Sequence, residues 1–456
     1  MLLSVPMQPV LLFLNDPMPG ASTTDDENSG YGAVGGSPKT WHNKQQTSLV
    51  IYLFSYKIKR REHMKKRINE KWFCAAFIIV CFLLITAGFG FAQEKTSGAL
   101  EKQEKVKLPK LMTWTAYDMG SNGYVQASAV GNALNKNYNL KLRVIPAGTD
   151  ISRYTPLREK RVDFSLSGLG AWLAWRGIFD FSSLEWGPQK YRVVWQTAGN
   201  CGLATAKEAN IKSLADMKGK RVPHMPGNPT FDLIHKSFLA FANLTEKDIV
   251  TVSFPSYGKS QKGLIDNQAD CIFSTVEVPT MYELASSPRG IYWPEFPSAD
   301  KEGWARLHKY APFIGPRIIG EGAGMIPGKT KPRELAVYPY PVLIANENQD
   351  ENLVYNLAKA IHESYGLYKS VSVAMPGWEL KKAFSVPLYF PVHPGTVRFL
   401  KEIGAWTPAL GKRNNELLAE EKTRIKKWNE FKEQAVKQKL SADEIRNSWH
   451  KLELGF

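Results

Sequence analysis

Cysteine and histidine are scarce in this chain, which has four cysteines and eight histidines in 456 residues. Only Cys201 and Cys271 lie outside the N-terminal 92 residues, far apart in sequence, so they form either one disulfide or two separate buried thiols. The later histidines lack the clustering that metal ligands need, so we expect no metal site. These histidines are His224, His235, His308, His362, His393 and His450.

Motifs for catalysis or nucleotide binding are lacking too. The chain has no His-Glu-x-x-His, no Cys-x-x-Cys and no Gly-x-x-x-x-Gly-Lys-Ser/Thr Walker loop. Residues Ser256 to Lys259 fit Ser-x-x-Lys, but the companion motifs of that chemistry are absent. Residues Gly322 to Gly328 lack the glycine spacing of a dinucleotide loop, and we expect a turn there. We therefore expect a binding protein without catalytic residues or cofactor.

One long apolar run, Trp72 to Ile85, follows the basic residues 64–67 and precedes Gly90-Phe91-Ala92. This pattern is typical of a secretory signal peptide at 64–92, cleaved after Ala92, which implies a periplasmic protein. An uncleaved membrane anchor is the alternative. Residues 25–30 and 32–39 are polar and glycine-rich, so we expect residues 1–63 to be disordered or an upstream extension of a chain that starts at Met64 rather than Met1.

The net charge is +16, but the basic residues are scattered along the chain. No stripe of arginines interleaved with aromatic residues is present, so nucleic acid is not an expected partner.

A strand, a glycine loop and a helix are predicted from Leu111 to Lys136, with the loop at Gly120, Ser121, Asn122, Gly123 and Tyr124. Glycines allow a sharp turn, and the free N–H groups that open a helix favour a carboxylate or phosphate. The same pattern returns 107 residues later. There Gly227, Asn228, Pro229 and Thr230 separate a strand-like segment from a helix-like one.

A second pair of segments shares this offset, with Asp163 and Asp270 at equivalent places before core-like strands. The repetition predicts two similar βαβαβ lobes with facing glycine loops and a small-molecule site between them. Trp172 follows Ser167 and Gly168 at the end of a strand of the first lobe. It is either a core residue or a wall of the cleft.

Strands at Tyr191–Ala206 and Val342–Ala345 are predicted to cross between the lobes and to form a hinge. We expect lobe 1 at 107–198 and 340–404, and lobe 2 at 199–339. Residues 405–456 read as a charged helical extension. It is either an arm packed on the body or a contact for a second copy or a membrane protein, so we expect a monomer, with a dimer through this helix as the alternative.

Several segments together resemble one family, the TAXI class of solute receptors of tripartite ATP-independent periplasmic (TRAP) transporters. They are Gly120 to Tyr124, Ile211 to Val222, Pro226 to Thr230 and Val386 to Gly395. The resemblance implies a periplasmic binding protein type II fold that closes around one small solute, commonly a carboxylate, and delivers it to TRAP membrane subunits. It also covers other receptors of the same fold, so an ABC-type binding protein and a sensor that docks on a signalling kinase are alternatives.

Carried over by position, the family's binding loops correspond to Gly120–Tyr124, to Gly148, Thr149 and Asp150, and to Gly227–Thr230, with Glu277 after the last strand of lobe 2. The chain departs from the family in having Asn122 in a glycine-rich loop and Pro229, which lacks an N–H donor. Asp150 and Glu277 would add negative charge to a cleft, which disfavours a simple dicarboxylate and favours an amino acid or a neutral solute compatible with aromatic side chains. The family resemblance and these charges together lead us to expect a carboxylate or an amino acid.

Overall fold

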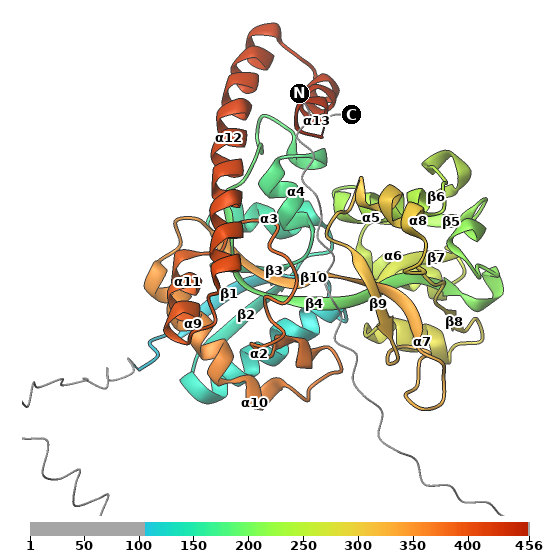
Figure 1. Ribbon diagram of the computed structural model, residues 1–456, viewed down its shortest axis with the longest axis horizontal. Coiled ribbons are helices and arrows are strands. Elements are labelled where there is room, and N and C mark those ends of the chain that lie inside the picture. The colour runs from blue at the N-terminus through green and yellow to red at the C-terminus, as the bar shows by residue number, and fades with distance from the viewer. Residues whose placement is uncertain (1–104, 455–456) are drawn as a thin grey trace, which may run out of the picture. The chain divides into compact units, whose positions relative to one another are not determined.

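The computed structural model describes residues 105–454 (Figure 1). The expected upstream extension and signal peptide, 1–63 and 64–92, lie outside these residues. Within 105–454, no helix is both long and apolar enough to cross a bilayer.

Two groups of strands and helices form two α/β lobes. Lobe 1 contains β1 (Leu111–Ala116), α2 (Asn122–Tyr138), β2 (Lys141–Pro146), α3 (Asp150–Arg158), β3 (Phe164–Ser167), α4 (Gly170–Arg176), α9 (Glu351–Glu363), α10 (Tyr365–Tyr368) and α11 (Pro394–Glu402). Lobe 2 contains β5 (Arg221–His224), α5 (Pro229–Phe241), β6 (Val250–Ser253), α6 (Tyr257–Ile265), β7 (Cys271–Thr275), α7 (Pro279–Ser286), β8 (Ile291–Tyr292), α8 (Lys301–His308) and β9 (Gly315–Ile319).

Two long strands, β4 (Tyr191–Ala206) and β10 (Arg333–Asn346), belong to both lobes (Figure 1). They pair with each other in antiparallel register, with a shift between Pro339 and Val342. In lobe 1, β10 lies beside β3 in the order β2-β1-β3-β10-β4, and in lobe 2, β4 lies beside β7. The prediction of β4 is confirmed to the residue, whereas β10 begins well before the expected Val342. Paired strands that run through both lobes are a natural hinge.

The two lobes repeat the same side-chain to backbone hydrogen bond at equivalent positions. The Asp163 carboxylate accepts the N–H of Thr113 on β1 at 2.7 Å, and the Asp270 carboxylate accepts the N–H of Arg221 on β5 at 2.8 Å. At the two helix entries, Gly120 and Gly227 have φ of +83° and +75°, a conformation that favours glycine. The predicted α/β fold with two similar lobes is confirmed.

The two cysteines are free and buried, so of the two expected alternatives the separate thiols are correct. Cys201 on β4 lies opposite Thr275, and Cys271 on β7 lies opposite Thr205, so the thiols sit at opposite ends of the same strand pair. Burial raises the pKa of both thiols, which keeps them protonated.

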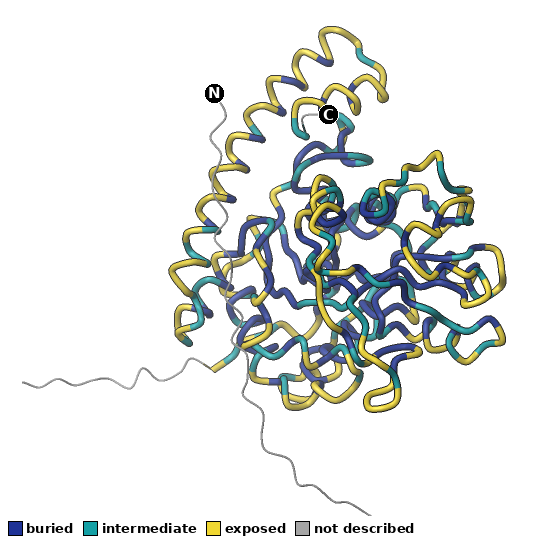
Figure 2. The backbone as a smooth tube through the Cα atoms, turned by 45° about the vertical axis from the view of Figure 1, so that its right-hand side comes forward, coloured by how far each residue is buried: buried dark blue, intermediate teal, exposed yellow. Residues whose placement is uncertain are grey.

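Helices α12 (Pro408–Gln438) and α13 (Ala442–Leu454) form a C-terminal arm. Figure 2 shows buried positions recurring along an otherwise exposed α12. They follow one another at steps of three and four residues, the spacing of a single helix face. They are Asn414, Leu417, Glu421, Arg424, Trp428, Phe431 and Ala435. The expected helical extension is confirmed, and this face packs on lobe 1.

The arm is fixed to lobe 1 by buried polar contacts as well as apolar packing. Both carboxylate oxygens of Glu421 accept hydrogen bonds of 2.8 Å from the Arg192 guanidinium, and one accepts the Trp175 indole N–H at 2.6 Å. Helix α13 folds back so that Trp449 packs against Trp428 and Phe431.

Candidate functional site

The residues of the first glycine loop divide between three environments. Ser121 caps α2 by accepting the N–H of Tyr124 at 3.2 Å, and the Tyr124 ring packs against the lobe 1 core. The Asn122 amide instead points across to lobe 2, where it donates to Thr275 Oγ1 at 3.3 Å. Of the side chains in this loop, the structure therefore brings Asn122 to the junction of the lobes.

Asp150 joins the two lobes through a buried ion pair. Its carboxylate lies 2.5 Å from the Arg153 guanidinium, and both side chains are 0% exposed. The same carboxylate accepts the N–H of Thr230, at the start of α5 in lobe 2, at 3.1 Å. Burial raises the pKa of Asp150, and the Arg153 charge and the Thr230 hydrogen bond oppose that rise. Asp150 is thus a lobe-bridging residue with its own partners.

A second carboxylate of lobe 1 makes a similar contact. Asp118 accepts the N–H of Gly258, in the first turn of α6, at 2.9 Å. A Cβ at Gly258 would lie 2.9 Å from Asp118 Oδ2, and a Cβ at Gly148 would lie 2.5 Å from the Cβ of Ser256. Glycine at both positions therefore permits the lobes to approach this closely.

These contacts correct one expectation from the sequence. We expected the N–H groups that open the helices to be free for a solute, but Asp150 and Asp118 already accept N–H groups of α5 and α6. The Gly227 carbonyl also accepts the N–H of Ile151 at 3.1 Å. The reason is that lobe 1 supplies its own carboxylates to the positive ends of the lobe 2 helices.

Asn228 and Thr230, the other polar residues of the lobe 2 loop, are buried. Neither the amide of Asn228 nor the hydroxyl of Thr230 has a hydrogen-bond partner within residues 105–454. Thr149 caps α3 through Ser152. Its side chain therefore serves the helix, and it lies beside Gly227 of lobe 2, where an added Cβ would be 3.7 Å from Thr149 Oγ1.

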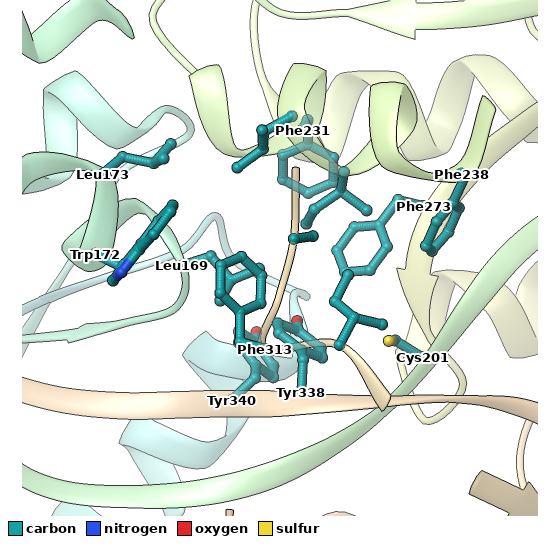
Figure 3. Close-up of a cluster of buried hydrophobic side chains, with 14 of the residues drawn as sticks. Leu169, Trp172, Leu173, Cys201, Phe231, Phe238, Phe273, Phe313, Tyr338 and Tyr340 are labelled. Carbon is teal, nitrogen blue, oxygen red and sulfur yellow. The ribbon is translucent and has the colours of Figure 1, made fainter. Parts of the chain in front are cut away.

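Aromatic rings fill the centre of the junction (Figure 3). Tyr117 lies edge-on to Tyr340 with ring centres 5.7 Å apart, and Arg153 lies 3.7 Å above the Tyr117 ring. A Cβ at Gly168 would lie 2.7 Å from the Tyr117 hydroxyl, and Ser167 is hydrogen-bonded to Tyr154. Ser167 and Gly168 are therefore part of a packed layer.

Trp172 also lies at the junction, in contact with lobe 2. Its ring is edge-on to Phe313 with centres 5.2 Å apart, and it borders a small cavity of about 140 Å³ that Leu233, Tyr310 and Leu454 also line. Trp172 is therefore a buried residue of lobe 1 that also packs against lobe 2.

A larger cavity of about 390 Å³ opens between the lobes beside the crossing strands. Asn122 and Lys382 line it from lobe 1, Glu277 and Arg317 from lobe 2, and Asn200 and Tyr340 from the crossing strands. Two residues predicted from the sequence, Asn122 and Glu277, meet in this cavity, while the other predicted residues lie in the contacts described above. A concave space with a few convergent polar groups is the usual form of a small-molecule site.

The polar groups of this cavity form a short chain. Asn200 donates from Nδ2 to Glu277 Oε1 at 2.9 Å, and its Oδ1 accepts from Arg317 at 3.2 Å. Burial raises the pKa of Glu277 to about 7, although the Asn200 hydrogen bond and the Arg317 charge oppose the rise. Among residues 105–454 no carboxylate lies within ion-pair distance of Arg317. We refer to Arg317, Asn200 and Glu277 as the cavity triad.

Sequence reasoning missed Arg317, Asn200 and Lys382. Arg317 lies in a proline-rich region without a clear period, and Asn200 is one of several polar residues in β4, with no local pattern that sets it apart. Only the pairing of β4, β10 and β9 shows that these side chains face the same space.

The described part of the chain contains no group of three or more metal-ligating side chains. Three histidines have a different use, since a ring nitrogen accepts a backbone N–H. His235 accepts from Phe273 at 2.9 Å, His393 from Gly395 at 3.2 Å and His450 from Phe179 at 2.6 Å. Residues Gly322 to Met325 form a turn, as expected.

Solved structures with this topology include several binding proteins. The structure of R. palustris Rpa4515 with adipate is 13% identical; the match covers 68% of this chain and 99% of Rpa4515, with a TM-score of 0.41. PhnD1 from Prochlorococcus marinus, in complex with methylphosphonate, is 14% identical. The match covers 65% of this chain and 99% of PhnD1, with a TM-score of 0.38. An ABC transporter periplasmic binding protein from Brucella ovis with glutathione bound is 10% identical. The match covers 56% of this chain and 70% of the Brucella protein, with a TM-score of 0.36.

The model of one protein family matches residues 118–404, which are more than half of the chain. The match begins after β1 and contains the rest of both lobes and both crossing strands, and it ends before the C-terminal arm. The chain therefore belongs to the NMT1-like family.

Proposed function

We propose that this protein is an exported solute receptor that captures a small, carboxylate-bearing solute between its two lobes. The observation that supports the proposal is the cavity of about 390 Å³. Lobe 1, lobe 2 and the crossing strands all contribute side chains to it, so a bound solute would contact both lobes and favour their closed arrangement. Asn122 and Glu277 are the predicted site residues that we assign to binding.

Capture in this proposal involves no chemical step. Micromolar affinity corresponds to about 8 kcal/mol, which a few charge-assisted hydrogen bonds and the exclusion of water can supply. Among the remaining predicted residues, Asp150, Gly227 and Thr230 make hydrogen bonds between the lobes, and we assign them to positioning the lobes against each other. Their role is closure, and their effect on affinity is indirect.

The TAXI resemblance supports delivery of the solute to TRAP membrane subunits in the periplasm. Growth or uptake assays test this step. Deletion of the TRAP membrane genes should abolish receptor-dependent uptake of the solute, and uptake that persists through an ABC permease would contradict it.

Native mass spectrometry of the purified protein tests the receptor proposal. The expected result is an additional mass of a small molecule that is released unchanged on denaturation. A protein that carries no small molecule, and that none of a broad panel of metabolites stabilises against heat, would contradict the proposal. Recovery of a chemically altered solute would instead indicate an enzyme.

A further inference from the structure

The cavity triad contains a cation, Arg317, that has no carboxylate within ion-pair distance among residues 105–454. The inference drawn from this arrangement rests on the proposed function. Arg317 is a cation that donates a hydrogen bond to the neutral side-chain amide of Asn200. Lys382, from the opposite lobe, lines the same cavity, and its recorded ion pair is with Glu379 at 3.5 Å on the surface. A cation without a carboxylate partner at the wall of a cavity is suited to an anionic ligand.

We propose that Arg317 binds the carboxylate of the solute and that Glu277 takes up one proton when this carboxylate binds. The proton comes from solvent. It converts the ionised Glu277 carboxylate to a neutral carboxyl group, which then lies beside the bound solute carboxylate. The neutral carboxyl can then donate its O–H to the ligand. Asn200 holds the two ends of the triad in place and is a positioning residue.

The surroundings of Glu277 favour this uptake of a proton. The Arg317 charge on β9 lowers the pKa of the Glu277 carboxyl, and the negative charge of Glu321, in the loop after β9, raises it. Cys201 on β4 and Tyr282 on α7 face it as neutral groups, because burial, and to a smaller extent the Glu277 charge, raises their pKa values. Its pKa of about 7 before binding lies close to physiological pH. A further anion in the cavity would raise the pKa more, so the proton would be bound at neutral pH.

The affinity of the protein for carboxylates should therefore depend on pH. Below pH 7 Glu277 is already neutral, and the affinity should reach a plateau. Above pH 7 each bound anion must be accompanied by a proton, so the affinity should fall about tenfold between pH 6 and pH 8. Titration calorimetry in two buffers of different ionisation enthalpy should show uptake of nearly one proton at pH 8.

The test uses the full chain and matched probes, namely hexanoate and glutarate with hexanamide and glutaramide as neutral analogues and cadaverine as a cation. Carboxylates should bind and their analogues should not. Arg317→Gln should weaken carboxylate binding at least tenfold, whereas Arg143→Gln, at an exposed position of β2, should have no effect. Glu277→Gln should bind carboxylates with the same affinity at pH 6 and pH 8, without proton uptake.

Several results would overturn the inference while leaving the receptor proposal intact. They are binding of the amides or of cadaverine in preference to carboxylates, unchanged carboxylate binding by Arg317→Gln, or a co-purified solute that lacks a carboxylate. If no probe binds and no small molecule co-purifies, the receptor proposal itself fails. Thermal unfolding of each variant separates loss of binding from loss of folding.

Discussion

Asp150 and Arg153 form an ion pair that excludes water completely. Removing one member of such a pair leaves an uncompensated buried charge, which typically costs about 3–5 kcal/mol. In this protein the cost should be large also because Arg153 lies over the Tyr117 ring at the junction of the lobes.

Asp150→Asn should therefore lower the free energy of unfolding by roughly 3–5 kcal/mol in a urea titration. Asp266→Asn is the control, since Asp266 pairs with Lys262 on the surface and its loss should change little. Equal stability of Asp150→Asn and the parent protein would show that the pair contributes nothing to the fold.

His235 supplies a dependence of stability on pH. Burial lowers its pKa to about 4, and its ring nitrogen accepts the Phe273 N–H, so the folded protein holds it neutral. The unfolded chain binds a proton near pH 6.5, hence the stabilisation is complete above pH 6.5 and is lost as the pH falls toward 4.

The free energy of unfolding should fall by about 1.4 kcal/mol per pH unit from His235 alone between pH 6 and pH 4.5. Urea titrations of the parent protein and of His235→Gln check this. The variant should show a smaller slope, and identical slopes would contradict the assignment of His235 as a neutral acceptor.

At the scale of elements, the C-terminal arm depends on aromatic packing between its two helices. Trp449 is 0% exposed and its ring centre lies 4.8 Å from that of Trp428. A Cβ at Gly187 would lie 2.3 Å from the Trp428 indole nitrogen, so the loop before β4 also closes on this cluster.

Trp449→Ala should release the arm, because loss of a buried tryptophan typically costs about 3–5 kcal/mol. Hydrogen exchange followed by mass spectrometry should show faster exchange in α13 and in the second half of α12, with lobe 2 unchanged. Leu452→Ala, at a position that is 61% exposed, should behave like the parent protein. Faster exchange throughout both lobes would indicate that the arm is part of the global fold.

The elements that the sequence predicted well are those with a local signal. The bounds of β4 followed from two strand-like segments, Val193–Gln196 and Cys201–Ala206, and the two helix entries followed from glycines that adopt positive φ. The start of β10 was missed because Pro339 and Pro341 interrupt its pattern. The burial of Asp150 had no local signal either, since it depends on the approach of two segments about 80 residues apart.

For the candidate site, the sequence identified loops rather than the space between them. Asn122 and Glu277 were predicted and line the cavity, but Arg317 and Asn200 reach it only through strand pairing across the hinge. The sequence predicted that helix N-termini would bind an anionic solute. In the structure the carboxylates of Asp118 and Asp150 accept N–H groups at the N-termini of α6 and α5 instead.

On the scale of the whole molecule, the lobes meet through two carboxylate contacts and a layer of aromatic rings, with the candidate cavity beside the hinge. Carboxylates on one lobe and helix N-termini on the other stabilise the closed arrangement without occupying the cavity. A solute in the cavity adds contacts to both lobes, so closure and binding should be coupled.

The distance between the lobes, measured with and without solute, tests this account most directly. Spin labels at Lys136→Cys in lobe 1 and Lys247→Cys in lobe 2 occupy exposed positions, whereas Cys201 and Cys271 are buried. In pulsed electron resonance, protein that retains its solute should give a narrow distance distribution. Protein stripped of solute by unfolding and refolding should give a longer or broader one, which the released solute restores. Identical distributions in the two samples would contradict capture by closure of the lobes.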